Sequence, residues 1–169
     1  MRPRRIAVLG RAGSGKTTTA LALAVALDLP AVHLDQLYWT SDRTPVTVER
    51  FDARHAAAIA TDSWILDGGY MSHDSFADRL RRVDVVVVTE ASLARCLVRV
   101  VRRTIRHRRR ARIDAPPGAA EAFSLTFLLW IIDWSRRHPD LPGEIAAMAP
   151  GIPIVVVRDR GDLDRLIAG

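Results

Sequence analysis

Lys16 and Thr17 are the residues of this sequence with the clearest chemical context. They end the segment GRAGSGKT, residues 10–17, in which a glycine and four further residues are followed by Gly-Lys-Thr. This spacing is that of the phosphate-binding P-loop, in which the backbone N–H groups of a glycine-rich turn surround phosphate oxygens. It predicts that Lys16 contacts the β and γ phosphates of a nucleotide and that the Thr17 hydroxyl binds Mg²⁺.

The glycines of this segment explain how a turn can bind an anion. Without a Cβ, Gly10, Gly13 and Gly15 can adopt φ values that let successive N–H groups point inward. The residues that follow are predicted to open a helix, whose positive end adds to the attraction for phosphate. The predicted nucleotide-binding residues are Gly10, Ala12, Gly13, Ser14, Gly15, Lys16, Thr17 and Thr18.

Lys16 is also the only lysine among the 25 lysine and arginine residues. A composition so strongly skewed toward arginine indicates a coding bias. We expect lysine to survive where a compact ammonium must lie among phosphates, because a broad planar guanidinium would not fit there. The alternative is a chance glycine-rich turn without a ligand, which the strand before it and the helix after it disfavour.

Asp35 and Asp67 are two further candidates, because each follows a predicted strand, at residues 31–34 and 64–66. In open α/β sheets, ligands bind beyond the carboxyl ends of the strands. An apolar strand that ends in a carboxylate is typical of a Walker B strand, so Asp67 is predicted to hold Mg²⁺, usually through water. Asp35 is predicted to serve the substrate or Mg²⁺, with a helix N-cap as the alternative.

The alternation of apolar runs with helical patterns predicts the fold class. It indicates an α/β protein with a three-layer P-loop NTPase fold and a five-stranded parallel sheet joined by right-handed crossovers. The predicted strands cover residues 6–9, 31–34, 64–66, 83–88 and 153–157. The predicted helices run to residue 27 from the P-loop and over residues 48–60, 75–82, 92–107, 121–137, 143–148 and 161–168. The bulky apolar residues of 121–137 are predicted to be core.

Length and composition set broad limits. A chain of 169 residues is predicted to form a single domain over residues 1–169. The net charge of +6 favours anionic ligands. Cys96 is the only cysteine, which excludes an intrachain disulfide and a cysteine zinc cluster and agrees with a cytoplasmic location. No apolar run is long enough to cross a membrane, so no membrane partner is expected.

Arginines gather in the segment after the fourth predicted strand. On the helix predicted over residues 92–107, one stripe is apolar and another is basic; the basic stripe contains Arg95, Arg99, Arg102 and Arg106. Four more arginines follow by residue 112, and residues 113–120 contain Pro-Pro-Gly, which predicts a mobile loop. We expect about half of these arginines to be a solvated helix face.

Three segments together resemble a known family. Residues 10–17, His-Leu-Asp-Gln-Leu-Tyr-Trp at 33–39 and Trp-Ile-Leu-Asp-Gly-Gly-Tyr at 64–70 look like the adenylate-kinase-like proteins known as topology modulation proteins. The Cys96-Leu97 helix with its arginines and the helix with Phe-Leu-Leu-Trp-Ile at 127–131 are also similar, so the resemblance extends from Ile6 to about Arg160.

The resemblance implies a nucleoside-monophosphate-kinase-like fold with ATP and Mg²⁺ as cofactors and a short Arg-rich lid, at approximately residues 103–120. It implies that Asp35 helps hold the phosphate acceptor and that Asp67 and Gly68 contact Mg²⁺ and the acceptor. It also implies that lid arginines, for which we select Arg99 and Arg103, clamp the transferring phosphoryl group.

The sequence departs from these families after Gly68. Adenylate kinases proper have Pro and Arg soon after Asp-Gly, whereas Gly69, Tyr70 and Met71 stand here, which weakens the case for AMP as the acceptor. The topology modulation group usually has Asn at the position of Gly69.

The favoured function is therefore a kinase that transfers the γ-phosphoryl group of Mg-ATP to a small acceptor. Its predicted catalytic residues are Lys16, Asp35, Asp67, Arg99 and Arg103. One alternative is a nucleotide-dependent nucleic-acid-binding protein that places the arginines of residues 95–112 on phosphates, although no aromatic residue for base stacking is interleaved. Another alternative is an NTPase without an acceptor.

Overall fold

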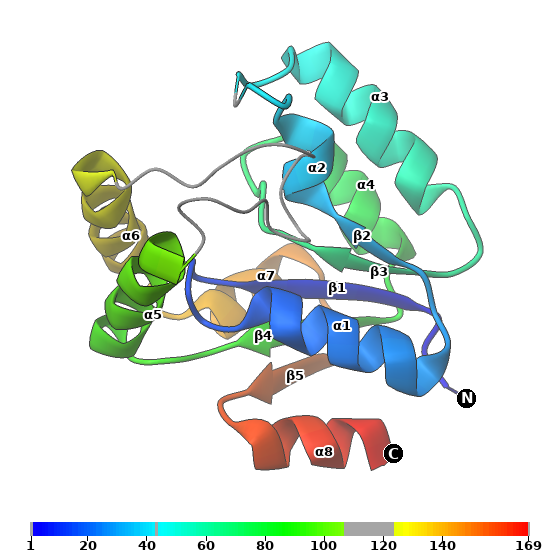
Figure 1. Ribbon diagram of the computed structural model, residues 1–169. Helices are drawn as coiled ribbons and strands as arrows, with labels where there is room; N and C mark the ends of the chain where they lie inside the picture. Colours follow the sequence, from blue (N-terminus) through cyan, green and yellow to red (C-terminus); the bar gives the residue numbers. More distant parts are fainter. Residues whose placement is uncertain (1, 43, 107–123, 169) are drawn as a thin grey trace.

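Five parallel strands form one sheet in the order β2-β3-β1-β4-β5 (Figure 1). The computed structural model describes residues 2–42, 44–106 and 124–168. The strands are β1 Arg5–Gly10, β2 Ala31–His33, β3 Trp64–Asp67, β4 Val85–Thr89 and β5 Ile154–Val157. Every pairing is parallel, so the predicted five-stranded parallel sheet is confirmed.

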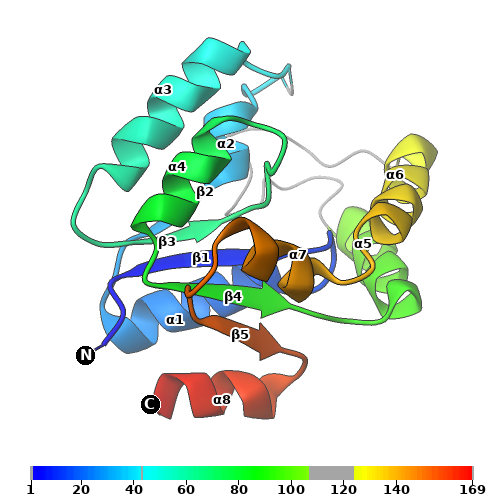
Figure 2. The same ribbon diagram turned by 180° about the vertical axis from the view of Figure 1, so that it is seen from behind.

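Helices cover both faces of the sheet, as a three-layer fold requires (Figures 1 and 2). One face carries α1 Lys16–Leu27 and α8 Arg160–Ala168, and the other carries α3 Val48–Ile59, α4 Ser75–Arg82 and α7 Leu141–Met148. The short α2 Leu34–Tyr38 follows β2, and α5 Leu93–Arg106 and α6 Leu125–Arg137 lie beyond the carboxyl ends of the central strands. Among the described residues, no helix is long and apolar enough to cross a membrane.

The central strands are buried on both faces, which explains their nearly continuous apolar sequences. Ile6 and Val8 of β1 pack into the cluster that contains residues of α1 and α8. Ala7 and Leu9 pack into the cluster on the opposite face, with residues of α3, α4 and α7. Alternate side chains therefore belong to different layers, and β1 is fixed between them.

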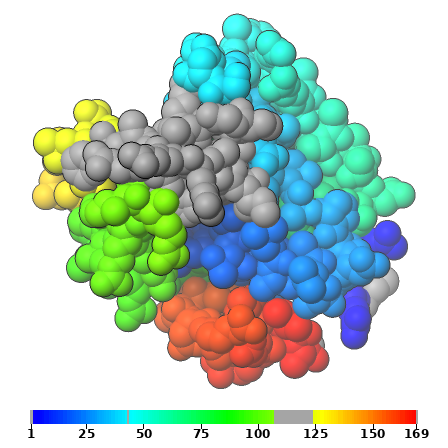
Figure 3. All heavy atoms as spheres, in the orientation of Figure 1, coloured from blue at the N-terminus to red at the C-terminus, as the bar shows by residue number. Residues whose placement is uncertain are grey.

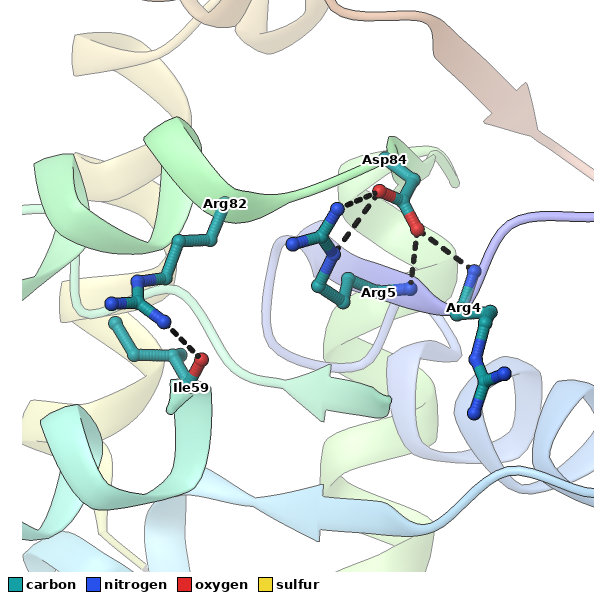
Figure 4. Close-up of polar contacts among 5 residues, drawn as sticks. All are labelled: Arg4, Arg5, Ile59, Arg82 and Asp84. Atoms are coloured by element: carbon teal, nitrogen blue, oxygen red, sulfur yellow. Dashed lines mark hydrogen bonds and ion pairs between the residues drawn. The ribbon is translucent and has the colours of Figure 1, made fainter. Parts of the chain in front are cut away.

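The amino ends of β1 and β4 are joined by Asp84 (Figure 4). Its Oδ2 accepts hydrogen bonds of 2.9 Å from the backbone N–H groups of Arg4 and Arg5, and its Oδ1 lies 2.7 Å from Nη2 of Arg5. Nearby, Nη1 of Arg82 donates to the carbonyl of Ile59 at the end of α3. These contacts stabilise the amino ends of the strands, at the end of the sheet opposite the P-loop.

Several predicted boundaries differ from the structure, most of them by one or two residues. Leu34, predicted as the last residue of a strand, begins α2. The strand predicted over residues 83–88 begins two residues later, because Val83 caps α4 through a backbone hydrogen bond to Arg79. Of the helix predicted over 121–137, residues 121–123 lie outside the described residues, and the described helix begins at Leu125, where the Ser124 side chain accepts from the N–H of Phe127 and caps it.

The prediction that the apolar residues of α6 form core is also largely wrong. Of the described residues of this helix, only Ile131 is buried, whereas Phe127 is 37% exposed and Trp130 is 45% exposed. The helix lies at the margin of the molecule (Figure 3), where it contacts α5.

Candidate active site

The glycine-rich turn between β1 and α1 packs closely against the end of β4 and against α5. Gly10 has a φ of 141° and Gly13 a φ of 83°, values that disfavour any side chain. A Cβ on Gly10 would lie 2.5 Å from the carbonyl oxygen of Thr89, and a Cβ on Gly13 would lie 2.5 Å from that of Cys96. Both positions therefore require glycine for two independent reasons.

Lys16 opens α1 and turns its ammonium back over the turn. Its Nζ donates a 3.0 Å hydrogen bond to the carbonyl of Arg11, which also accepts from the N–H and the hydroxyl of Ser14. Burial lowers the pKa of Lys16, while the nearby charges of Asp67 and Asp35 act to raise it. The charges of both predicted carboxylates therefore act on the ammonium, for which a phosphate oxygen would be a stronger, charged acceptor than the Arg11 carbonyl.

The carboxylate of Asp67 is the meeting point of two elements. Its Oδ2 accepts a 2.7 Å hydrogen bond from the Thr17 hydroxyl and lies 3.0 Å from Nδ1 of His33. Burial acts to raise the pKa of Asp67, but the hydrogen bond from His33, the charge of Lys16 and the hydrogen bond from Thr17 outweigh it and hold that pKa below its usual value. Asp67 is therefore a buried, ionised carboxylate at neutral pH.

His33 is a residue of this site that the sequence analysis missed. It ends β2, and its Cα is the register partner of Asp67 in the parallel pair of β2 and β3. Neighbouring strands that end in His and Asp must bring those side chains to the same edge of the sheet. The position of a histidine near the end of the strand that precedes the Asp67 strand was the signal that could have found it.

Thr17 and Asp67 fit a Mg²⁺ ion by their chemistry, since both offer oxygen ligands beside the P-loop. Within the described residues, no group of three or more His, Cys, Asp or Glu side chains could hold a metal alone. The protein would thus supply few ligands, and phosphate oxygens and water would complete the shell, which is the usual arrangement for Mg²⁺ in nucleotide sites.

Asp35 lies in the first turn of α2. The N-cap interpretation of Asp35 is wrong, because His33 occupies the N-cap position of this helix. The Oδ1 of Asp35 accepts a 2.7 Å hydrogen bond from the hydroxyl of Tyr70, a residue that sequence analysis considered only as a departure from related families. A carboxylate held in this way can accept or orient an acceptor hydroxyl.

An aromatic cluster stands behind Asp35. The ring of Tyr38 lies 4.9 Å from that of Tyr70 and 5.4 Å from that of Phe51, and Trp39 meets Tyr38 edge to face at 5.0 Å. His73 closes the cluster at 4.6 Å from Phe51. These rings therefore pack around Tyr70, the side chain that donates to Asp35.

Two arginines of α5 reach the P-loop. Nη1 of Arg99 donates to the backbone carbonyls of Ser14 at 3.0 Å and Gly13 at 3.3 Å. Arg103 lies near enough to Lys16 for its charge to act on the Lys16 pKa. Most of the predicted lid, from residue 107 to residue 120, lies outside the described residues.

A cavity of about 420 Å³ opens on the other side of the turn, at the carboxyl end of β4. Its described lining includes Gly10, Arg11, Arg95, Trp134, His138 and Arg158, but none of Lys16, Asp35 and Asp67. It lies beside the predicted catalytic residues rather than among them.

Solved structures with the same architecture include kinases. Shikimate kinase from Bacteroides thetaiotaomicron has a TM-score of 0.61 and 16% identity, with 99% of this chain and 96% of that chain covered. Shikimate kinase from Acinetobacter baumannii in complex with shikimate has a TM-score of 0.62 and 15% identity, with 96% and 88% covered. A gluconokinase from Sinorhizobium meliloti 1021 has a TM-score of 0.56 and 18% identity, with 98% and 88% covered. The sequence matches no protein-family model and no curated protein.

The chain has the fold of the small-molecule P-loop kinases. At such low identity, the likeness establishes the P-loop kinase fold alone. It agrees with the predicted adenylate-kinase-like architecture and does not confirm the narrower topology modulation group.

Proposed function

We propose that the protein is a Mg²⁺-dependent phosphotransferase that moves the γ-phosphoryl group of ATP to a hydroxyl of a small acceptor. The observation that carries this proposal is the hydrogen bond between Thr17 and Asp67 beside the ammonium of Lys16. Three groups suited to Mg²⁺ and phosphate converge there on one glycine-rich turn. The P-loop kinase fold supports the same chemistry.

The nucleotide would lie on the turn. Backbone N–H groups of residues 10–18 would bind its phosphates, and Lys16 would neutralise charge between the β and γ phosphates. Thr17 and Asp67 would hold Mg²⁺, which when bound neutralises the phosphate oxygens. Arg99, already against the carbonyls of the turn, and Arg103 would add positive charge where it develops in the transition state.

The acceptor would lie on the side of Asp35. The acceptor O–H proton passes to the Asp35 carboxylate, the acceptor oxygen forms a bond to the γ phosphorus, and the bond from that phosphorus to the ADP oxygen breaks. ADP leaves with the electron pair of that bond. The protein has little covalent chemistry to perform, so its contribution is positioning and charge neutralisation.

The residues beside Asp35 favour a small hydroxyl compound over AMP. Gly69 and Tyr70 follow Gly68 here, where adenylate kinases proper carry the residues that bind the acceptor nucleotide. The solved neighbours include shikimate kinases and a gluconokinase, whose names specify small hydroxylated acids. We also propose, on the resemblance of residues 10–17, 33–39 and 64–70, that the protein belongs to the topology modulation group.

The nucleic-acid alternative draws on one feature, the exposed basic face of α5 that contains Arg102 and Arg106. Arg99 from the same helix binds the P-loop instead, which favours the kinase. The two functions differ in the ligand that protects residues 95–112 from trypsin. A lid would be protected by Mg-nucleotide. A nucleic-acid surface would be protected by DNA, and that protection would fall steeply as the salt concentration rises.

A coupled assay of ADP release tests the proposal. Mg-ATP is supplied with a panel of hydroxy acids, polyols, nucleosides and nucleoside monophosphates, and the wild-type rate is expected to rise with at least one small alcohol. Lys16→Arg is the matched control, since it keeps the charge but introduces a guanidinium, and it should lose the stimulated rate. If the rate of ADP release is the same with and without every acceptor, the proposed transfer to an acceptor is contradicted, and an NTPase without an acceptor explains the ADP release.

A further inference from the structure

We propose that Tyr70 is the positioning residue of the acceptor site and that its phenol holds Asp35 in the orientation that receives the acceptor hydroxyl. The inference rests on the proposed function, because it assigns a role within the same transfer. The two side chains are 35 positions apart in the sequence and are joined by a 2.7 Å hydrogen bond from the phenol to Oδ1 of Asp35. One oxygen of the carboxylate is thereby fixed.

The phenol is a reliable donor to this carboxylate. Burial and then the negative charge of Asp35 raise the pKa of Tyr70 far above its usual value, so the hydroxyl keeps its proton. The same Asp35 charge acts to raise the pKa of Lys16, so the carboxylate and the ammonium of the P-loop interact electrostatically. A carboxylate that the phenol orients can accept or orient a hydroxyl of the acceptor.

The ring of Tyr70 is held by its neighbours. It lies 4.9 Å from the ring of Tyr38 and 4.9 Å from that of Phe51, which is fully buried. Because these aromatic contacts leave the ring little freedom, the hydroxyl presents the same direction to Asp35.

The backbone conformation at Tyr70 is unusual for a residue with a side chain, which supports a functional role for the tyrosine. Its φ of 49° lies in the left-handed region, which a residue with a Cβ adopts at a cost. The two preceding carbonyls, of Gly68 and Gly69, accept hydrogen bonds of 2.9 and 2.5 Å from the guanidinium of Arg79, which has no exposed surface. Glycine would suit the conformation at position 70 better, so the side chain is the reason for tyrosine there.

The first test reads the hydrogen bond directly. In protein labelled with ¹³C-aspartate, the carboxyl resonance of Asp35 is identified by its loss in Asp35→Asn. Tyr70→Phe removes only the hydroxyl and should shift this resonance at neutral pH. Tyr38→Phe removes a phenol from the same aromatic cluster and should leave it in place. An Asp35 resonance that is unchanged in Tyr70→Phe overturns the proposal.

The second test reads positioning, using the alcohol that most stimulates ADP release in the panel. Tyr70→Phe should lower kcat/KM for that alcohol by about tenfold or more, the usual effect of losing a hydrogen bond to a charged group. The KM for ATP should change by less than about twofold, because a lost acceptor contact leaves the P-loop intact. Tyr38→Phe should resemble the wild type in both constants.

The outcomes distinguish failure of the positioning role of Tyr70 from failure of the proposed phosphotransferase function. A shifted Asp35 resonance with an unchanged kcat/KM for the alcohol overturns the positioning role. A KM for ATP that rises as much as the KM for the alcohol also overturns it, because such a change indicates general damage to the site. If no acceptor in the panel stimulates ADP release, the proposed function fails and the positioning role falls with it, while the resonance still shows whether the hydrogen bond exists.

Discussion

The hydroxyl of Thr17 lies 2.7 Å from Oδ2 of Asp67, so the first turn of α1 and the end of β3 meet at a single oxygen. These residues are 50 positions apart in the sequence. Their contact connects the phosphate-binding turn to the carboxylate predicted to hold Mg²⁺, and the first prediction follows from it.

Asp67→Asn should damage turnover more than nucleotide binding. The amide can still accept from Thr17 but lacks the charge that would organise the metal, so kcat should fall by at least about 100-fold. The affinity for ATP, measured by calorimetry, should change much less. Asp62→Asn, an exposed change shortly before β3, is the control and should match the wild type. Turnover within a few-fold of wild type in Asp67→Asn would make Asp35 the better metal candidate.

Arg99→Gln should lower turnover with only a modest loss of ATP affinity. Arg99 contacts the carbonyls of Gly13 and Ser14, and the proposed function assigns its charge to the transferring phosphoryl group. We expect a loss of roughly tenfold in kcat. Arg102→Gln, an exposed arginine of the same helix, is the matched control. Comparable losses in the two variants would indicate a general charge effect rather than a specific clamp.

Arg79→Met should destabilise the fold. The guanidinium of Arg79 is fully buried and donates to the carbonyls of Gly68 and Gly69, which methionine would leave unpaired. The free energy of unfolding, from urea titration, should fall by about 2–4 kcal/mol. Arg82→Met removes an exposed arginine that donates to one carbonyl, of Ile59, and should cost less than about 1 kcal/mol. Similar losses for the two variants would contradict this account.

His55 should make stability depend on pH. This side chain is fully buried beside Phe51 and near Arg79, and burial followed by the Arg79 charge lowers its pKa to about 4. The unfolded chain takes up a proton below its usual pKa of roughly 6.5 and the folded chain does not. The contribution of a neutral His55 is thus fully present above pH 6.5 and is lost as the pH falls from 6.5 toward 4.

Urea titrations of wild type and His55→Phe at several pH values measure this effect. The difference in unfolding free energy between the two proteins should change by up to about 1.4 kcal/mol per pH unit within that window and should be constant above it. Subtracting the two curves removes the contributions of the carboxylates. A difference that does not vary with pH would show that His55 is not held neutral by the fold.

The sequence could predict the parts of this protein that depend on local chemistry. Gly10, Gly13 and Gly15 follow from the spacing of the glycine-rich turn, and all three have positive φ. The apolar run at residues 85–88 follows from burial on both faces, as a central parallel strand requires. These features depend on neighbours in the chain, so a single sequence contains them.

Other features depend on the tertiary arrangement and could not be predicted in this way. Local pattern assigned Leu34 to a strand, because only the packed chain shows where β2 ends and α2 begins. The hydrogen bond from Tyr70 to Asp35 needs an aromatic residue with a positive φ, which propensities argue against. The apolar residues of α6 predicted a core helix, but Trp130 is 45% exposed because the helix lies at the margin. In each case the environment overrides the local signal.

The most direct test of the central claim is ³¹P NMR of the reaction of wild-type protein with Mg-ATP and the best alcohol of the panel. The account predicts that ADP and a new phosphate monoester appear in equal amounts, and that Lys16→Ala, confirmed to be folded by circular dichroism, gives neither. ADP with inorganic phosphate but no ester would contradict phosphoryl transfer to an acceptor. Full activity in Lys16→Ala would contradict the assignment of the site.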